Sequence, residues 1–311
     1  MNMNPGSKIY VAGHRGMVGS AIVRRLLADG FSNLVLQTRQ DLDLTNQADV
    51  DAFFAREQPD YVFLAAAKVG GIHANSTYPA EFIRDNLAFQ TNVIHGAWKH
   101  GVKKLLFLGS SCIYPRDCPQ PIREEYLLTG PLEPTNQWYA IAKIAGIKLC
   151  QAYRQQYGFD AICAMPTNLY GPGDNYHREN SHVVPALIRR IHEAARRGDE
   201  EVVIWGTGNP LREFLHVDDL ADACLLLMQR YSAEQIVNVG SGEEVSIAQL
   251  AHMIADAAGY RGRLAFDARR PDGTPRKLLD TRTLDALAWR ARVPLTTGLA
   301  ESLREFAKQS A

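Results

Sequence analysis

The stretch Ile9-Tyr10-Val11-Ala12-Gly13-His14-Arg15-Gly16-Met17-Val18-Gly19 runs from a short apolar segment through a glycine-rich turn into a helical pattern that extends to Asp29. Glycines in such a turn let the backbone bend tightly and approach a diphosphate, whose charge meets the unpaired amides at the start of the helix. Glycines at this spacing also fit an ordinary tight turn. Because this turn opens a chain of alternating strand and helix patterns, we expect residues 13–19 to bind a dinucleotide.

Outward from this turn, short β-rich segments continue to alternate with longer amphipathic ones. We expect strands over 8–12, 34–38, 61–66, 104–108 and 161–165, and helices over 17–29, 47–58, 79–100 and 138–157. This order indicates βαβ units and predicts an α/β fold with a doubly wound parallel Rossmann sheet.

After Pro166 the alternation loosens, which indicates a second, smaller α/β lobe that binds the substrate. Within this half, helices are expected over 183–197 and 217–230, and strands over 202–205 and 236–239. We place the nucleotide-binding domain at 1–168 plus about 214–241, and the substrate-binding domain at about 169–213 plus 242–311.

Composition and charge exclude several classes of protein. The chain has 311 residues with 34 basic and 34 acidic side chains, so its net charge of 0 favours neither nucleic acid nor an anionic membrane as a partner. The apolar segments are strand-length, and the N-terminus lacks the pattern of a signal peptide. Five cysteines without a CxxC pair argue against a disulfide scaffold or a structural zinc site, so we expect no metal and a cytoplasmic location.

The end of the second expected strand indicates which dinucleotide binds. In NAD-binding sheets an acidic residue about 20 positions after the glycines accepts a hydrogen bond from the ribose 2′-hydroxyl. Arg39 occupies that place and Arg15 lies inside the turn, so two guanidiniums near a 2′-phosphate would favour NADP(H). The alternative is that both arginines are solvated and that Asp41 or Asp43 binds the ribose.

A candidate catalytic pair lies in the helix expected over 138–157. Tyr139 and Lys143 are four residues apart, so their side chains share one helix face. A cation near the phenol would lower the pKa of Tyr139 and let it exchange a proton with a carbonyl oxygen near neutral pH. Ser110 and Cys112 follow the strand over 104–108, at the sheet edge where α/β enzymes bind ligands. From the residues alone, Ser110 could instead cap a turn, and Cys112 could be a small buried apolar residue.

Several segments together resemble the extended short-chain dehydrogenase/reductase family. They are 13–19, 64–71, 109–115, 133–136, 165–172, 212–219 and 271–277, and the likeness runs from about Ile9 to Phe306. Within the family, the chain is most similar to the NADPH-dependent members that invert C3 and C5 and reduce C4 of GDP-4-keto-6-deoxy-D-mannose.

This resemblance implies a role for each catalytic candidate. Tyr139, with Lys143 and Ser110, would polarise the C4 ketone, while Cys112 and His182 would be the base and the acid of the epimerisations. The ketone acidifies the hydrogens at C3 and C5, and inversion requires that the proton return from the opposite face. A thiolate and an imidazole on either side of the ring could do this. His182 could alternatively cap the helix that follows it.

The resemblance also implies binding residues and an assembly. The cofactor site would comprise the turn 13–19 with Arg39, Asp43, Leu108, Lys143, Pro166, Asn168, Leu169 and His182. The GDP-sugar site would comprise Arg190, Trp205, Arg212, Asp272 and Lys277, with cations on the diphosphate; Arg189 could replace Arg190, and the basic residues between 261 and 277 could instead be solvated. Family members usually dimerise through the helices expected over 79–100 and 138–157, so we expect a homodimer.

Three other functions fit the sequence less well. A sugar-nucleotide dehydratase should carry an Asp-Glu pair after the serine, where this chain has Ser111-Cys112. A one-centre epimerase would normally have an acidic residue for NAD in place of Arg39. A regulator that only senses NADP would not need Ser110, Tyr139 and Lys143 together.

Overall fold

The computed structural model describes residues 3–270 and 272–310. Outside the described residues lie Met1, Asn2, Pro271 and Ala311. Pro271 is the first residue of the segment 271–277, and the other three lie at the ends of the two predicted domains.

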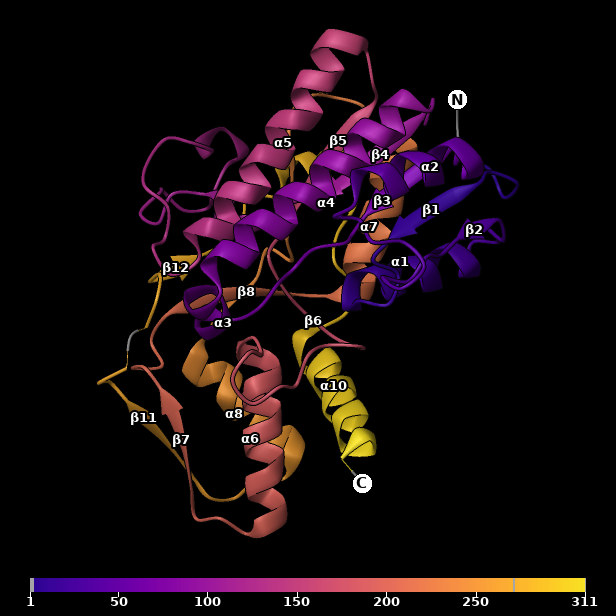
Figure 1. Cartoon of the computed structure of the whole chain (residues 1–311). Coiled ribbons are helices and arrows are strands. Elements are labelled where there is room, and N and C mark those ends of the chain that lie inside the picture. The colour runs from indigo at the N-terminus through magenta and orange to yellow at the C-terminus, as the bar shows by residue number, and fades with distance from the viewer. Residues whose placement is uncertain (1–2, 271, 311) are drawn as a thin grey trace.

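The central element is a parallel sheet of six strands in the order β2-β1-β3-β4-β5-β9 (Figure 1). The strands are β1 (Ile9–Ala12), β2 (Leu34–Val35), β3 (Tyr61–Leu64), β4 (Lys104–Leu108), β5 (Ala161–Pro166) and β9 (Val237–Val239). The chain passes from β1 to β2 on one side and then to β3 on the other. The carboxyl ends of β1 and β3 are therefore the point of reversal, which is where open α/β sheets bind ligands. The prediction of a doubly wound parallel sheet is confirmed.

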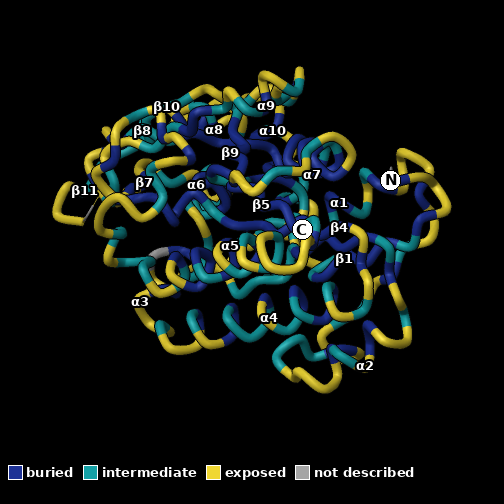
Figure 2. Tube along the Cα trace, turned by 90° about the horizontal axis from the view of Figure 1, so that it is seen from above, coloured by how far each residue is buried: buried dark blue, intermediate teal, exposed yellow. Residues whose placement is uncertain are grey.

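Helices cover both faces of this sheet. On one face lie α2 (Gln47–Glu57), α4 (Pro79–Lys99) and α5 (Gln137–Tyr157), and on the other lie α1 (Met17–Ala28) and α7 (Val217–Arg230). Successive strand residues point to opposite faces, so Tyr10 packs with the first group while Ile9 and Val11 pack with the second. Figure 2 shows the buried residues gathered between these two layers.

Strand β2 is shorter than expected, Leu34–Val35 instead of 34–38. The reason is a turn at Thr38, whose main-chain oxygen accepts from the amides of Asp41 and Leu42, at 3.1 and 2.9 Å. The Asp41 carboxylate closes the same turn by accepting from the Thr38 hydroxyl at 2.6 Å. The chain therefore leaves the sheet early and brings Arg39 to the molecular surface.

The second half adds a smaller lobe below the sheet in Figure 1. It contains β6 (Asn168–Tyr170), β7 (Glu201–Trp205), β8 (Leu211–His216), β10 (Glu244–Ser246), β11 (Arg263–Asp267) and β12 (Arg276–Lys277), with α6 (Val183–Arg197), α8 (Ile247–Ala258) and α10 (Leu295–Gln309). Strand β8 pairs with β6, β10 and β12, and β7 pairs with β11. The shorter elements of the chain are α3 (Ile72–Thr77), α9 (Arg282–Ala286), η1 (Ser111–Ile113) and η2 (Glu124–Tyr126).

Glu213 on β8 joins the lobe to the segments around it. Its side chain is fully buried, and its two carboxylate oxygens accept from the amides of Gly242 at 2.8 Å and Leu279 at 3.0 Å. Its main-chain oxygen accepts from the Asn168 side chain at 2.8 Å. One residue thus fixes three connections between the sheet and the lobe. The division of the chain into two domains at the expected boundaries stays a prediction.

Among the described residues, no helix has both the length and the apolar composition that crossing a bilayer requires.

Candidate active site

The glycine-rich turn after β1 is sterically restricted to glycine at two positions. Gly13 has φ +84°, and a Cβ there would lie 2.8 Å from the backbone of Ala66 after β3. A Cβ on Gly19 would overlap the carbonyl oxygen of Gly13. Helix α1 begins after Gly16 without a side-chain cap and without an acidic residue in its first turn, so its first amides and its positive dipole end are available to an anion.

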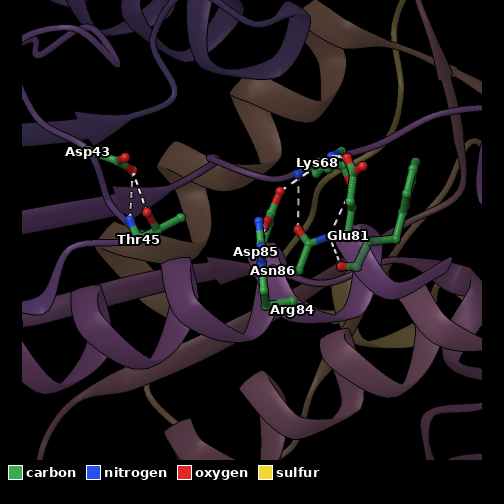
Figure 3. Close-up of polar contacts among 8 residues, drawn as sticks. Asp43, Thr45, Lys68, Glu81, Arg84, Asp85 and Asn86 are labelled. Atoms are coloured by element: carbon green, nitrogen blue, oxygen red, sulfur yellow. Dashed lines mark hydrogen bonds and ion pairs between the residues drawn. The ribbon is translucent and has the colours of Figure 1, made fainter. Parts of the chain in front are cut away.

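A cleft of about 630 Å³ lies between this turn and residues 37–40. Arg15 and Arg39 both line it and both are exposed. Asp41 and Asp43 are the carboxylates that could bind the ribose instead, and each accepts hydrogen bonds from a nearby threonine. Asp41 accepts from the Thr38 hydroxyl. Asp43 accepts from the amide and hydroxyl of Thr45 at 2.9 and 2.8 Å (Figure 3). These hydrogen bonds hold the pKa of both carboxyl groups below the usual range.

The loop after β3 is anchored on α4. The backbone N–H of Lys68 donates to Asn86 Oδ1, and Asn86 Nδ2 donates to the Lys68 carbonyl, both at 3.0 Å (Figure 3). Farther along the loop, the Gly71 amide donates to the main-chain oxygen of Asn180 at 3.1 Å. A Cβ on Gly71 would lie 2.6 Å from the Ser181 oxygen. The loop therefore supports the segment that immediately precedes His182.

Ser110 and Cys112 lie directly after β4. Ser110 caps the short helix η1, since its hydroxyl accepts from the Cys112 amide at 3.4 Å. The Cys112 side chain is buried, and burial raises its pKa, while the Lys277 cation and the Ser110 hydrogen bond act in the opposite direction. The thiol is therefore protonated unless a base accepts its proton.

Tyr139 and Lys143 extend from α5 toward the same place. Lys143 is buried and donates to the Leu108 oxygen at 2.7 Å, with Nζ 5.7 Å from the centre of the Tyr139 ring. Burial lowers the pKa of Lys143 to about 8. From the sequence, we expected the Lys143 cation to lower the pKa of Tyr139. That expectation is wrong for this structure, because burial, reinforced by Cys112, raises the pKa of the phenol. The phenol of Tyr139 is therefore protonated at neutral pH.

His182 occupies the N-cap position of α6, but its side chain makes no capping hydrogen bond. The residue as a whole is exposed. The surrounding protein and, after it, the Lys277 cation lower the pKa of the imidazole. The alternative that the His182 side chain caps α6 is therefore wrong.

The expected GDP-sugar residues form two groups. In the first, β12 places Lys277 beside Arg212 of β8, and the Asp272 carboxylate accepts from the amide and hydroxyl of Thr207 at 2.7 and 2.8 Å. Burial lowers the pKa of Arg212, and Asp272 partly offsets this. Lys277 affects the pKa of both Cys112 and His182, so this group borders the catalytic one.

The second group surrounds Trp205, which is 56% exposed. The guanidinium carbons of Arg190 and Arg270 lie 5.2 and 4.8 Å from its ring centres. Arg189 is buried instead and donates to the Arg178 oxygen at 3.2 Å, so Arg190 is the arginine that contacts Trp205. Arg270 is one of the basic residues between 261 and 277, and nothing in the sequence distinguishes it from the others as a binding residue.

The other predicted cofactor residues lie at the first or last positions of neighbouring strands. Leu108 is the last residue of β4 and Pro166 the last of β5, while Asn168 and Leu169 begin β6. Their contacts with a cofactor stay predictions. No cluster of metal-ligating side chains occurs within residues 3–270 and 272–310.

Comparisons with known proteins relate the whole chain to nucleotide-sugar enzymes. Residues 9–240 match the NAD dependent epimerase/dehydratase family. The chain is 65% identical to GDP-L-fucose synthase 1 of Arabidopsis thaliana, over 97% of this chain and 94% of the relative. It is 54% identical to GDP-L-fucose synthase of Escherichia coli, over 96% of both.

The chain is also similar to solved structures of enzymes that act on GDP-sugars. A GDP-6-OMe-4-keto-L-xylo-heptose reductase from C. jejuni is 38% identical with a TM-score of 0.93, and the match covers 100% of both chains. A GDP-L-fucose synthetase from Naegleria fowleri bound to NADP is 28% identical with a TM-score of 0.91, over 100% of this chain and 97% of the other.

Proposed function

The chain belongs to the NAD dependent epimerase/dehydratase family, and we propose that it converts GDP-4-keto-6-deoxy-D-mannose to GDP-L-fucose with NADPH. It would invert C3 and C5 and reduce C4. The observation that carries this proposal is a thiol beside a Tyr–Lys pair, since η1, which contains Cys112, packs against α5, which contains Tyr139 and Lys143. A dehydratase would need a carboxylic acid at that place, and a plain ketoreductase would need no thiol.

The residues around the glycine-rich turn fit NADP(H). Gly13 and Gly19 leave room for a backbone to approach a diphosphate, and the uncapped start of α1 offers its amides. Arg15 and Arg39 line the cleft where a 2′-phosphate would lie. When bound, the nicotinamide supplies the hydride for C4.

In the epimerisations, the hydroxyls of Ser110 and Tyr139 would hold the C4 oxygen while charge develops on it. Cys112, as the thiolate, would remove the proton from C3 or C5, and His182 would return one from the opposite face. The Lys277 cation stabilises the thiolate and lowers the pKa of His182, so the imidazolium would be less populated but a stronger acid.

In the reduction, Tyr139 would donate its proton to the C4 oxygen as the hydride arrives. Burial keeps the phenol protonated, which is the form that this step requires. Lys143, fixed by Leu108, would place a cation against the Tyr139 ring as the phenolate forms.

The second lobe would bind the GDP moiety. Arg212 and Lys277 offer cations to the diphosphate next to the catalytic side chains. Trp205 is 56% exposed and has two guanidiniums over its ring, so this group would contact the nucleobase or its ribose.

We also infer a homodimer formed by α4 and α5. Their surfaces carry apolar side chains, with Trp138 and Ile141 40% and 38% exposed and Tyr157 stacked on Trp98 at 4.1 Å. Such a patch is typical of a protein interface. The five cysteines are all free and buried, which is consistent with the predicted cytoplasmic location.

The test is to mix the purified protein with GDP-4-keto-6-deoxy-D-mannose and NADPH and to follow the reduced nicotinamide absorbance. We expect oxidation of NADPH and GDP-L-fucose as the product by NMR. Tyr139→Phe should bind NADPH normally and reduce the ketone roughly 100- to 10,000-fold more slowly. A product with unchanged C3 and C5, or faster turnover of another GDP-keto-sugar, would contradict the proposal.

A further inference from the structure

A small pocket lies beside Cys112. Its volume is about 30 Å³, which is room for one or two water molecules. Cys112 and Lys277 form part of its wall, and Glu133 and Asn136, from the segment that leads into α5, form another part. The proposed function assigns no role to Glu133 or Asn136.

Glu133 and Asn136 each have one buried oxygen that receives no hydrogen bond from any described residue, Oε2 of Glu133 and Oδ1 of Asn136. Asn136 is the N-cap residue of α5, where asparagine usually accepts from helix amides, yet its side chain makes no capping bond. Arg116 forms an ion pair with Glu133, Nε to Oε2 3.3 Å, without hydrogen-bond geometry. A buried acceptor left without a donor costs about 1–3 kcal/mol, and one water can donate to two acceptors at once.

The proposed function, on which this inference rests, creates a need for such a site. Inversion at the first carbon leaves Cys112 protonated and His182 deprotonated. Both are then in the wrong state for the second carbon. His182 is accessible to solvent and can regain a proton there, but Cys112 is buried, and burial favours the protonated thiol. The thiol therefore needs an acceptor within the protein.

We propose that Glu133 receives, through water in this pocket, the proton that Cys112 removes from the sugar. The S–H bond of Cys112 breaks as an O–H bond forms on the water, and another O–H bond of that water breaks as one forms on Glu133 Oε2. The thiolate is restored and the carboxylate becomes a carboxylic acid. Glu133 then releases the proton to solvent beside Arg116, whose side chain is 46% exposed.

In this arrangement Glu133 acts through Cys112 and does not contact the reacting carbons. Asn136 positions the water by accepting its second hydrogen. Lys277 stabilises the thiolate that the transfer leaves behind, since its cation opposes the effect of burial on Cys112.

The experiment measures deuterium entry at C3 and C5 of the substrate in deuterium oxide without NADPH, by NMR. Glu133→Gln keeps the shape of the side chain but accepts no proton, so exchange should slow roughly 100-fold. With NADPH present, products inverted at only one carbon should accumulate. The control is Glu125→Gln, which changes an exposed carboxylate that does not line the pocket and should leave exchange unchanged.

A second readout separates a proton relay from a structural role. Glu133→Ala should lose exchange and regain part of it when formate is added, because a small carboxylic acid can occupy the vacated volume. Glu133→Asp, which keeps a carboxylate, should retain more exchange than Glu133→Gln. Wild-type exchange in Glu133→Gln, or no rescue by formate, would overturn the relay. An absence of exchange in the wild-type protein would instead overturn the proposed function.

Discussion

Nζ of Lys143 donates a hydrogen bond of 2.7 Å to the main-chain oxygen of Leu108, and this contact joins α5 to the carboxyl end of β4. The side chain is 3% exposed, and Nζ also lies 4.8 Å from the centre of the Phe107 ring. A cation held out of water at this place destabilises the folded protein. We propose that this cation serves to stabilise the phenolate that would form on Tyr139.

The first prediction is a dependence of stability on pH that Lys143 causes. Its pKa is about 8 in the folded protein, against 10.5 as the ordinary value. Between these pH values the unfolded chain binds the proton and the folded protein does not, so the free energy of unfolding rises with pH. The rise from pH 8 to 10.5 should be larger in the wild type than in Lys143→Met, by up to about 3 kcal/mol. Urea denaturation measures it, and equal slopes in the two proteins would contradict it.

Local spacing was sufficient to predict the parts of the site that lie within one element or one turn. Gly13 directly follows β1 and Gly19 lies in the first turn of α1, so the turn is visible in the sequence. Tyr139 and Lys143 share a face because α5 is helical throughout. The parallel sheet followed from the alternation of patterns, which the strand order confirms.

Contacts between distant segments could not be predicted in this way. Lys277 reaches the pocket of Cys112 because the two-residue strand β12 pairs with β8, and so short a strand has no periodicity. Arg270 and Arg190 meet on Trp205 only in the folded lobe. The pKa of Tyr139 was predicted in the wrong direction because spacing indicates a neighbouring charge but not the burial that outweighs it.

The second prediction concerns cofactor choice. Arg39→Asp places a carboxylate in the cleft that Arg15 also lines. It should weaken NADPH binding roughly 10- to 100-fold, as expected for a charged hydrogen bond to phosphate, and favour NADH. Titration of each nucleotide by fluorescence measures both affinities. The control is Arg304→Asp, an exposed position on α10. Equal use of NADH and NADPH by the wild-type protein would show that the two arginines do not select the cofactor.

The third prediction concerns Arg270, whose guanidinium carbon lies 4.8 Å from the centre of the Trp205 ring. Arg270→Ala should raise KM for the GDP-sugar about 3- to 10-fold, the size of a partly exposed cation–π contact, with little change in kcat. Its neighbour Arg269 pairs with Asp267 at 2.7 Å, so Arg269→Ala is the matched control. If both variants raise KM equally, the effect belongs to the general charge of the segment and not to the contact with Trp205.

The fourth prediction concerns the support of His182 by the loop after β3. A Cβ on Gly71 would lie 2.6 Å from the Ser181 oxygen, so Gly71→Ala must displace the segment before His182. Misplacement of a reacting group by about 1 Å can cost roughly 100-fold. We therefore expect the variant to invert C3 and C5 more slowly than the wild-type protein, while Tyr139 still reduces the ketone. NMR should then show a mixture of inverted and uninverted products. Gly6→Ala, whose Cβ would approach only Asn4 at 3.4 Å, should give the wild-type product. An unmixed product from Gly71→Ala would show that the loop does not position the imidazole.

The last prediction separates the two activities at Cys112. Cys112→Ser changes the side chain little in size, so the fold and NADPH binding should persist. A serine hydroxyl is a far weaker acid than a thiol and supplies no comparable base. Deuterium entry at C3 and C5 should therefore fall by at least roughly 100-fold.

Reduction should survive in this variant, because Ser110, Tyr139 and Lys143 still hold the C4 oxygen. The expected product is a GDP-6-deoxyhexose of uninverted configuration, formed slowly. Cys118 provides the matched control, since it is also a buried thiol near the Lys277 cation but takes no part in the proposed chemistry. If Cys112→Ser and Cys118→Ser both yield products with wild-type deuterium at the two carbons, another residue is the base. Cys112 would then be no more than the small buried side chain that its position after β4 also permits.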